Sequence, residues 1–360
     1  MKKCIPLAIL LVAVFQVSAQ KKLARYFPGA EGSGNDNVEA LIDLFIKPIG
    51  NDICILPNNG WYSTAKTHKK WGFDMSVTVN SVFVSNEDKF YSFPTLAGLS
   101  YLGTDDNANP NSSNPIPTAY GPELVNPLFE ITQGPNDGVQ YKGPDGFDPA
   151  ASYFIEAAFI PTLQAGLGLW KNTDLRFRYT PKVEINSVGF GNWGVGLMHD
   201  IKQYIAGETD NSFAISLFVA YTRANGTVDL TGVYSGSGQE AKVSASGITA
   251  QAIVSKEFSV LTLYGALGYD KGNTTVDING VYNVNSYRDA FTDIDTPLPT
   301  PFTLTNPFTY DYEKSGLRFT AGLRLRLGPI TLNGDYSFVG DRRVLTLGLG
   351  FLTDGKRDSE

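Results

Sequence analysis

The sequence predicts an all-β fold, namely a transmembrane antiparallel β-barrel of about 12–14 strands with a short N-terminal helical plug or cap. Three observations predict it. The chain begins with an export signal, no later segment has 18 consecutive apolar residues, and runs of 10–14 residues alternate apolar and polar side chains. An even number of strands returns both ends of a barrel to one side of the membrane, and fourteen is the number we favour.

Residues 1–19 have the features of a signal peptide. Lys2 and Lys3 precede an apolar stretch over Ile5–Phe15, and Val17-Ser18-Ala19 has the small residues of a cleavage site. The apolar stretch is too short to span a bilayer as a helix, which takes about 20 residues. We therefore expect an exported chain, in which Cys54 is the only cysteine left after cleavage and no internal disulfide forms.

The composition argues against several classes of function. The formal net charge is −7, which argues against a nucleic-acid partner, because such proteins need a basic surface to displace counterions from phosphate. Glycines (37) and aromatic residues (22 Phe, 18 Tyr, 4 Trp) are abundant, whereas there are only two histidines. So few histidines leave little room for a metal site or for histidine-based catalysis.

Residues 20–70 lack strand alternation and predict a helix. Asp36 and Glu39 have capping-box spacing, an apolar face recurs every three to four residues from Val38 to Phe45, and Pro48 is expected to end the helix. Two roles are open for it. The helix could plug the barrel from the periplasmic side, or it could pack under the barrel rim and merely close it.

The strands are predicted over residues 71–352, followed by a polar tail over 353–360. In Leu175–Ile185 one face is apolar except for Pro181 while the other is polar or charged, and the pattern recurs in 73–80, 163–169, 213–221, 317–326, 330–338 and 345–351. Runs this long fit tilted transmembrane strands better than the strands of a soluble sandwich.

The connections between strands divide into short and long. Lys171-Asn172-Thr173, Lys256-Glu257 and Gly328-Pro329 predict short periplasmic turns, and Asn225-Gly226 and Asn279-Gly280 predict type I′ hairpins. Residues 102–150 and 286–312 are expected to form long loops on the outer side or folded inward.

The charged faces of the strands are expected to point into the lumen. An arginine that faces lipid at the bilayer midplane costs roughly 2–4 kcal/mol, so the arginines of two strands together would cost more than the whole stability of a typical domain. Inside, these side chains could tune ion selectivity or form a salt-bridge network that fills a closed lumen. The candidate lumen residues are Asp74, Arg176, Arg178, Lys182, Glu184, Arg318, Arg324, Arg326 and Asp335.

Other candidate sites are weaker. His199-Asp200 could belong to a hydrolase, but no G-x-S-x-G elbow accompanies it, so no enzyme is expected. Lys66, Lys69 and Lys70 around His68 could attract an anion or form a solvated turn. Asp105-Asp106-Asn107 and the aspartates of 289–295 do not fit a calcium loop, so neither a metal nor a cofactor is expected.

Several segments carry a resemblance that covers most of the chain from about residue 50. Residues 59–69 running into Gly72-Phe73-Asp74, together with 161–169, 181–183 and 193–203, resemble an uncharacterised outer-membrane barrel family of Bacteroidetes-type bacteria. In architecture alone, a helix-plugged barrel is similar to the long-chain fatty-acid transporters of the outer membrane. The resemblance implies an outer-membrane protein but does not indicate its substrate.

Together these observations predict a passive channel or transporter of the outer membrane for small molecules that could be hydrophobic. The alternative is a structural or surface-interaction barrel with a closed lumen. The expected partners are outer-membrane lipid, an unidentified small molecule and the barrel assembly machinery.

Overall fold

The computed structural model describes residues 22–30, 35–105, 114–148, 157–185, 188–205, 212–232 and 234–353. The predicted signal peptide and the tail beyond Thr353 lie outside these residues. Within them, no helix combines the length and the apolar character needed to cross a membrane.

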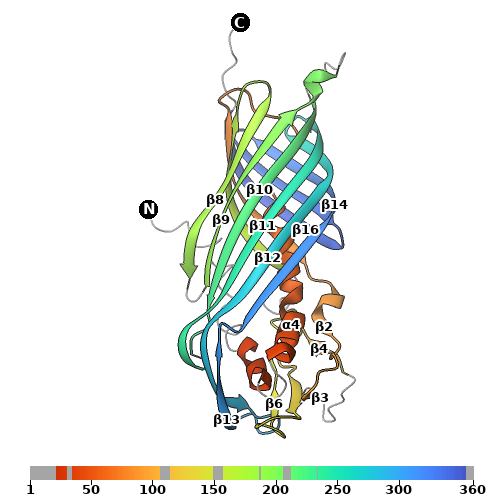
Figure 1. Cartoon of the computed structure of the whole chain (residues 1–360). Helices are drawn as coiled ribbons and strands as arrows, with labels where there is room; N and C mark the ends of the chain where they lie inside the picture. Colours follow the sequence, from red (N-terminus) through yellow and green to blue (C-terminus); the bar gives the residue numbers. More distant parts are fainter. Residues whose placement is uncertain are drawn as a thin grey trace.

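Ten antiparallel strands form a closed ring (Figure 1). Each strand pairs with its neighbours in the order β10-β9-β8-β7-β1-β16-β15-β14-β12, and β11 closes the ring by pairing with both β10 and β12. The predicted all-β barrel is confirmed. Its strands are β1 (Phe73–Phe83), β7 (Ala157–Gly168), β8 (Thr173–Ile185), β9 (Val188–Asp200), β10 (Phe213–Asp229), β11 (Ser235–Phe258), β12 (Leu261–Arg288), β14 (Phe308–Leu327), β15 (Ile330–Val339) and β16 (Arg342–Thr353).

The ring of the described residues has ten strands because several strands are longer than expected. Asn225-Gly226 is not a turn, since it lies inside β10, where Asn225 pairs with Ser244 of β11. Asn279-Gly280 likewise lies inside β12, opposite a β-bulge of β11, and Gly280 has a φ of 112°. The two predicted hairpins were therefore wrong, because the glycines serve a continuous strand and a bulge instead of a chain reversal.

The outer wall carries an apolar belt. On β14 the outward side chains are apolar from Leu317 to Leu327, whereas Glu313 and Asp311 on the same face beyond the belt are exposed and charged. Eleven residues match the length of a tilted strand that crosses a bilayer. Exposed aromatic side chains border the belt at the end with the short turns (Trp71, Phe73, Trp170, Phe258, Phe351) and at the opposite end (Tyr179, Trp193, Tyr269, Phe338). Such a belt between two aromatic girdles is typical of transmembrane barrels.

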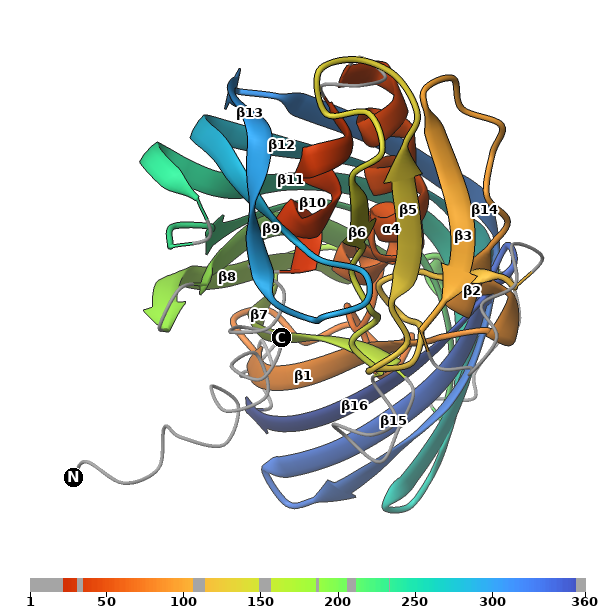
Figure 2. The ribbon, with the colours of Figure 1, turned by 90° about the horizontal axis from the view of Figure 1, so that it is seen from below.

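Beyond the belt, the long strands β11, β12 and β14 extend away from the short turns and pack against a folded cap, which lies at the bottom of Figure 1 (Figures 1 and 2). The cap contains the helix α4 (Asn35–Ile55), the 3-10 helices η2 (Ala24–Gly29) and η4 (Asn86–Lys89), a sheet of β3 (Leu99–Thr104), β5 (Pro127–Ile131) and β6 (Gln140–Lys142), the pair β2 (Phe90–Tyr91) and β4 (Ile116–Pro117), and β13 (Asp295–Thr305). Its core is aromatic, with Tyr26, Phe27, Phe45, Phe129 and Tyr141 fully buried. Much of the two segments expected to be loops is therefore folded.

The helix α4 confirms the amphipathic pattern but not its predicted end. Val38 to Phe45 bury their apolar face, yet the helix continues past Pro48 to Ile55. Its last turns pack against the wall, where Gly272 approaches so closely that an added Cβ would lie 1.8 Å from the Cys54 carbonyl oxygen. This packing offsets the backbone hydrogen bond that the proline removes.

The position of the helix differs from the expected one. The helix lies at the cap end, whereas the short turns and the start of β1 lie at the opposite end (Figure 1). The chain between α4 and β1 therefore has to run the length of the barrel. If the short turns face the periplasm, as we expect, the helix cannot plug the barrel from that side.

Candidate functional site

The candidate site is the barrel lumen, through which residues 56–70 run as a plug segment. The segment begins in η3 (Leu56–Asn58), near the cap, where the Asn58 amide donates to the carbonyl oxygens of Ile248 (3.2 Å) and Lys271 (3.3 Å). Farther along, the Ala65 N–H donates to Ser255 Oγ at 3.1 Å. Trp61 and Tyr62 between these points are buried, so the segment fills the lumen at this level.

Arg178 holds the plug segment to the wall. Its two terminal nitrogens donate to the Pro57 and Asn59 carbonyl oxygens, both at 2.7 Å, and one of them also donates to Gln164 Oε1 at 3.1 Å. The guanidinium lies 4.0 Å from the ring centre of Trp61, a cation–π geometry. The side chain is 2% exposed, so these contacts form in a dry setting.

Arg176, two residues earlier on β8, faces the same way because side chains alternate along a strand. One of its nitrogens donates to the Trp61 carbonyl oxygen at 3.0 Å, and the other lies 3.5 Å from both Asp74 and Asp174. The two arginines thus bind three successive odd-numbered carbonyl groups of the plug segment, at Pro57, Asn59 and Trp61. They fasten the plug and do not line an open bore.

The remaining lumen candidates belong mostly to the wall. Arg318 donates to Asp270 at 2.8 Å and to Ser337 at 3.0 Å, and both members of the ion pair are buried. Asp335 accepts from the Tyr264 hydroxyl at 3.0 Å. The contacts of Arg318 join neighbouring strands, and the Tyr264–Asp335 hydrogen bond reaches from β12 over β14 to β15. Together they compensate buried charges on the lumen face.

Arg324 and Arg326 lie toward the short-turn end. Arg324 is 8% exposed and lines a void of about 20 Å³ with Gly60, Ser63 and Asp74, among others, a space large enough for about one water molecule. Arg326 is half-buried and donates through Nε to the Gly328 carbonyl oxygen at 3.2 Å. The lumen is therefore nearly filled here as well.

Lys182 and Glu184 do not face the lumen. A register shift between Thr180 and Val183 moves the end of β8 by one residue, so that Glu184 lies opposite Gly189 on the outer face. Lys182 Nζ is 2.8 Å from Glu184 Oε1, with side chains 56% and 67% exposed. The prediction for these two residues was wrong, because a strict alternation carried through Pro181 ignores the bulge.

His68 is a lumen residue that the sequence reasoning missed. Its Nδ1 lies 2.8 Å from Asp174 Oδ2, its Nε2 lies 3.3 Å from Asp74 Oδ2, and its backbone N–H donates to Asp174 Oδ1 at 2.9 Å. The plug segment thus ends between two carboxylates of the wall. Nothing in the sequence indicates that residues 106 positions apart meet here. The nearby Lys66 is no free anion site, since it pairs with Glu257 at 2.8 Å.

A second cluster ties α4 to the barrel. Arg342 forms a two-nitrogen ion pair with Asp88 and lies 3.2 Å from Asp52, which also accepts from the Tyr120 hydroxyl at 2.9 Å. Burial raises the pKa of Asp52 to about 7, although Arg342 opposes this effect. Two carboxylates thus share one guanidinium, and the more buried of them holds its proton more tightly.

The other sequence candidates have structural partners. His199 contacts Thr173 (2.8 Å) and Tyr204 (3.1 Å), while Asp200 accepts from the Lys202 N–H at the start of η5 (Lys202–Tyr204), so the two neighbours do not form a pair. In the loop near residue 290, Asp289 accepts from its own turn. Asp105, Asp293 and Asp295 pair with Lys142 or Arg288. Among the described residues, no three candidate ligands come together for a metal ion.

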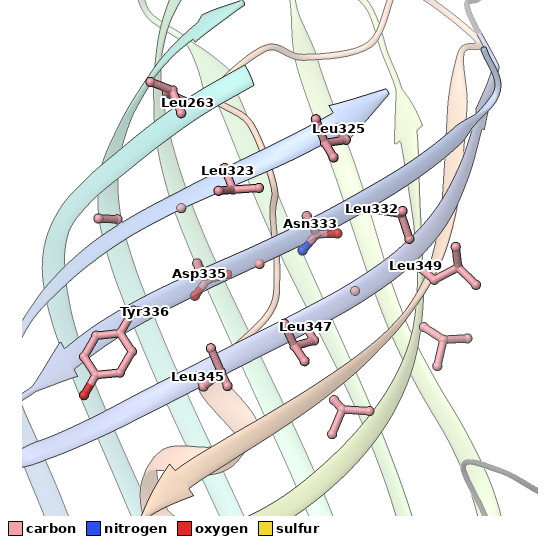
Figure 3. Close-up of a pocket in the computed structure, with 16 residues that line it drawn as sticks. Leu263, Leu323, Leu325, Leu332, Asn333, Asp335, Tyr336, Leu345, Leu347 and Leu349 are labelled. Atoms are coloured by element: carbon pink, nitrogen blue, oxygen red, sulfur yellow. The ribbon is translucent and has the colours of Figure 1, made fainter. Parts of the chain in front are cut away.

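A large hollow lies on the outer wall and not in the lumen. It has a volume of about 1150 Å³ and spans β1, β16, β15, β14 and β12 (Figure 3). Outward leucines such as Leu323, Leu332 and Leu347 line it. Because these residues belong to the apolar belt, the hollow fits the expected contact with lipid acyl chains.

A family model matches residues 1–353, nearly the whole chain, and describes a family of unknown function, DUF6588. The chain belongs to this family. The membership fits the expected uncharacterised barrel family, whereas its expected source in Bacteroidetes-type bacteria stays a prediction. Among curated proteins, none matches the sequence.

Solved structures similar to the family member described here are outer-membrane barrels of varied function. They include Ail, the attachment invasion locus protein of Yersinia pestis (15% identity, 50% of this chain, 93% of that chain, TM-score 0.25), and the outer membrane protease OmpT of Escherichia coli (7%, 82%, 99%, 0.28). A FadL homologue of Pseudomonas aeruginosa matches at 11% identity over 79% of this chain and 90% of that chain, with a TM-score of 0.22. Likenesses this distant carry no argument about activity.

Proposed function

We propose that the protein is an outer-membrane barrel whose lumen is closed by its own plug segment and whose task is performed by the cap, as a structural or surface-interaction module. The observation that carries this proposal is the fastening of the plug by Arg176 and Arg178 to three backbone carbonyl groups. A barrel that served chiefly for passage would not need its buried cations bound to its own chain.

The cap supports the same proposal. It has a buried aromatic core beyond the apolar belt, to which side chains of β12 and β14 also contribute, and the strands β11 and β12 extend well past the belt to hold it. If the short turns face the periplasm, as is usual for such barrels, the cap stands on the cell surface. The expected partners there are outer-membrane lipid and molecules outside the cell, and the barrel assembly machinery would insert the chain.

The second candidate is the gated passage of a small, hydrophobic molecule. The observation that favours it is a set of buried lumen side chains with unpartnered polar atoms, including Thr78, Asn80 and Asn192, which leaves polar groups available if the plug moves. Catalysis is not part of either proposal, because the His199 ring contacts Thr173 and Tyr204 and no carboxylate of the described residues orients it.

Single-channel recording separates the two candidates. The mature chain, folded in detergent, is inserted into a planar bilayer, and folding is checked by its heat-modifiable band on a gel. A closed barrel gives no discrete current steps under conditions in which a variant with residues 56–67 replaced by a glycine–serine stretch of the same length conducts. Regular steps from the unaltered protein would overturn the closed-lumen proposal and favour gated passage.

A further inference from the structure

The hydrogen-bonded ladder between β7 and β8 stops part-way up the barrel wall. Gln164 pairs with Arg178, and the pairing continues from there to the short turn, but 157–163 and 179–185 are not paired with each other. Elsewhere in the described ring, neighbouring strands stay paired to within two residues of the point where the shorter one ends. We call the unpaired stretch between β7 and β8 the seam.

Two prolines explain why the seam forms. If the register of Gln164 with Arg178 continued, Pro161 would lie directly opposite Pro181. Neither residue has a backbone N–H, so neither can donate a ladder hydrogen bond. The bulge of β8 after Thr180 then turns the rest of that strand out of register. The sequence therefore builds a break at this point of the wall.

The lumen beside the seam is polar and positively charged. Arg178, at the foot of the seam, has no carboxylate partner among the described residues, and its Nε is unpartnered there. On three successive strands, Thr180, Asn192 and Thr222 each have a side-chain oxygen to which no described residue hydrogen-bonds. The last two residues are at least 95% buried. Buried cations and unpartnered polar atoms are costly unless an anion or other polar group reaches them.

The seam begins at the level of the aromatic girdle on the cap side. Tyr179 is the first β8 residue past the last pair and belongs to the aromatic girdle on the cap side, as does Trp193, opposite it on β9. Aromatic girdles lie at the level of the lipid head groups. A head group at this level is therefore beside the seam, while its acyl chains contact the apolar belt below.

We propose that the seam admits the anionic head group of a membrane lipid. Arg178 and the Thr180 hydroxyl donate to its phosphate oxygens, and the amide oxygen of Asn192 accepts from a head-group hydroxyl. The inference rests on the proposed membrane location and names the class of ligand, an anionic lipid, that would bind there. It does not depend on whether the lumen conducts ions. An anion fits because Arg178 is the buried cation nearest the seam and lacks a carboxylate partner.

Fluorescence quenching of Trp61 tests the proposal, because this indole stacks on Arg178 inside the lumen. A variant that keeps Trp61 as its only tryptophan is placed in bilayers that contain phosphatidylglycerol or phosphatidylcholine with a nitroxide near the top of an acyl chain. We expect at least twofold stronger quenching of Trp61 by the anionic lipid at equal mole fraction. A variant that keeps only Trp170, exposed at the short-turn end and away from the seam, should be quenched equally by both lipids.

Two substitutions at one position provide the matched comparison. Gln164→Glu places a carboxylate where Arg178 already donates, so it should abolish the preference for the anionic lipid. Gln164→Met has a similar size but no charge, so it should retain the preference. Equal quenching of Trp61 by the two lipids, or a preference that survives Gln164→Glu, overturns the proposal. Relief of quenching by millimolar inorganic phosphate would also overturn it, because the site would then bind a free anion.

The Trp170 variant distinguishes failure of the seam proposal from failure of the membrane location. If the nitroxide lipids quench neither Trp170 nor Trp61, the barrel is not embedded as proposed, and the membrane location itself fails. If they quench Trp170 but show no preference at Trp61, only the seam proposal fails.

Discussion

Replacing Arg178 with methionine should loosen the plug segment. The substitution keeps an apolar stem of similar reach but removes three hydrogen bonds and the contact with Trp61. Each buried acceptor left without its donor costs about 1–3 kcal/mol, and a desolvated cation–π contact contributes about 2 kcal/mol. Because removal of the charge also relieves its desolvation, we expect a net loss of about 4 kcal/mol, which favours the released plug by a factor of about a thousand.

Two measurements check this expectation. In planar bilayers, Arg178→Met should show transient current steps that the unaltered protein lacks. A cysteine at Ser63, in a Cys54→Ser background, should react with a water-soluble thiol reagent far faster when Arg178→Met is present. Arg223→Met serves as the matched control, since Arg223 is exposed on the outer face of β10. A silent bilayer together with unchanged labelling would refute the reasoning that Arg178 fastens the plug.

Three further predictions concern the cap and its attachment. In the folded protein the pKa of Asp52 is raised from the ordinary 3.8 to about 7, so the free energy of unfolding should fall by up to about 1.4 kcal/mol per pH unit as the pH rises from 4 to 7. The stability is read as the temperature at which half of the folded band has shifted on a gel. Asp52→Asn should make this midpoint less dependent on pH, and an unchanged dependence would contradict the raised pKa of Asp52. Gly272→Ala should displace α4, because its Cβ would overlap the Cys54 carbonyl, and it should lower that midpoint. Gly226→Ala is its comparison, since a Cβ there meets only ordinary contacts at 3.6 Å and beyond. Phe129→Ala should cost the cap about 3–5 kcal/mol and speed its proteolysis while the barrel band persists, and loss of both together would show that they fold as one unit.

The strands were predictable because the alternation of apolar and polar side chains can be read within one strand alone. In β14, for example, Leu317 and Arg318 show which face is which without any knowledge of the neighbouring strand. The helix pattern from Val38 was predictable for the same reason. Where the pattern was interrupted, as at Pro181, the sequence reasoning continued the alternation and misplaced Lys182 and Glu184.

The site was less predictable because its main contacts involve the backbone. Arg178 binds the carbonyl oxygens of Pro57 and Asn59, and every residue has such an oxygen, so no residue type marks the partner. Similarly, the meeting of His68 with Asp174 depends on the path of the plug segment through the barrel. That path follows from the closure of the whole ring and is not encoded in any local pattern.

The course of the plug segment also constrains the order of assembly. The chain runs from the cap through the lumen and only then enters β1, which pairs with the last strand, β16. Once these two strands join, the ring encircles its own chain, and the filled lumen leaves no passage for a folded cap. The cap segment must therefore cross to the cap side of the barrel while the first and last strands are still apart. The barrel then closes around a plug segment that is already in place.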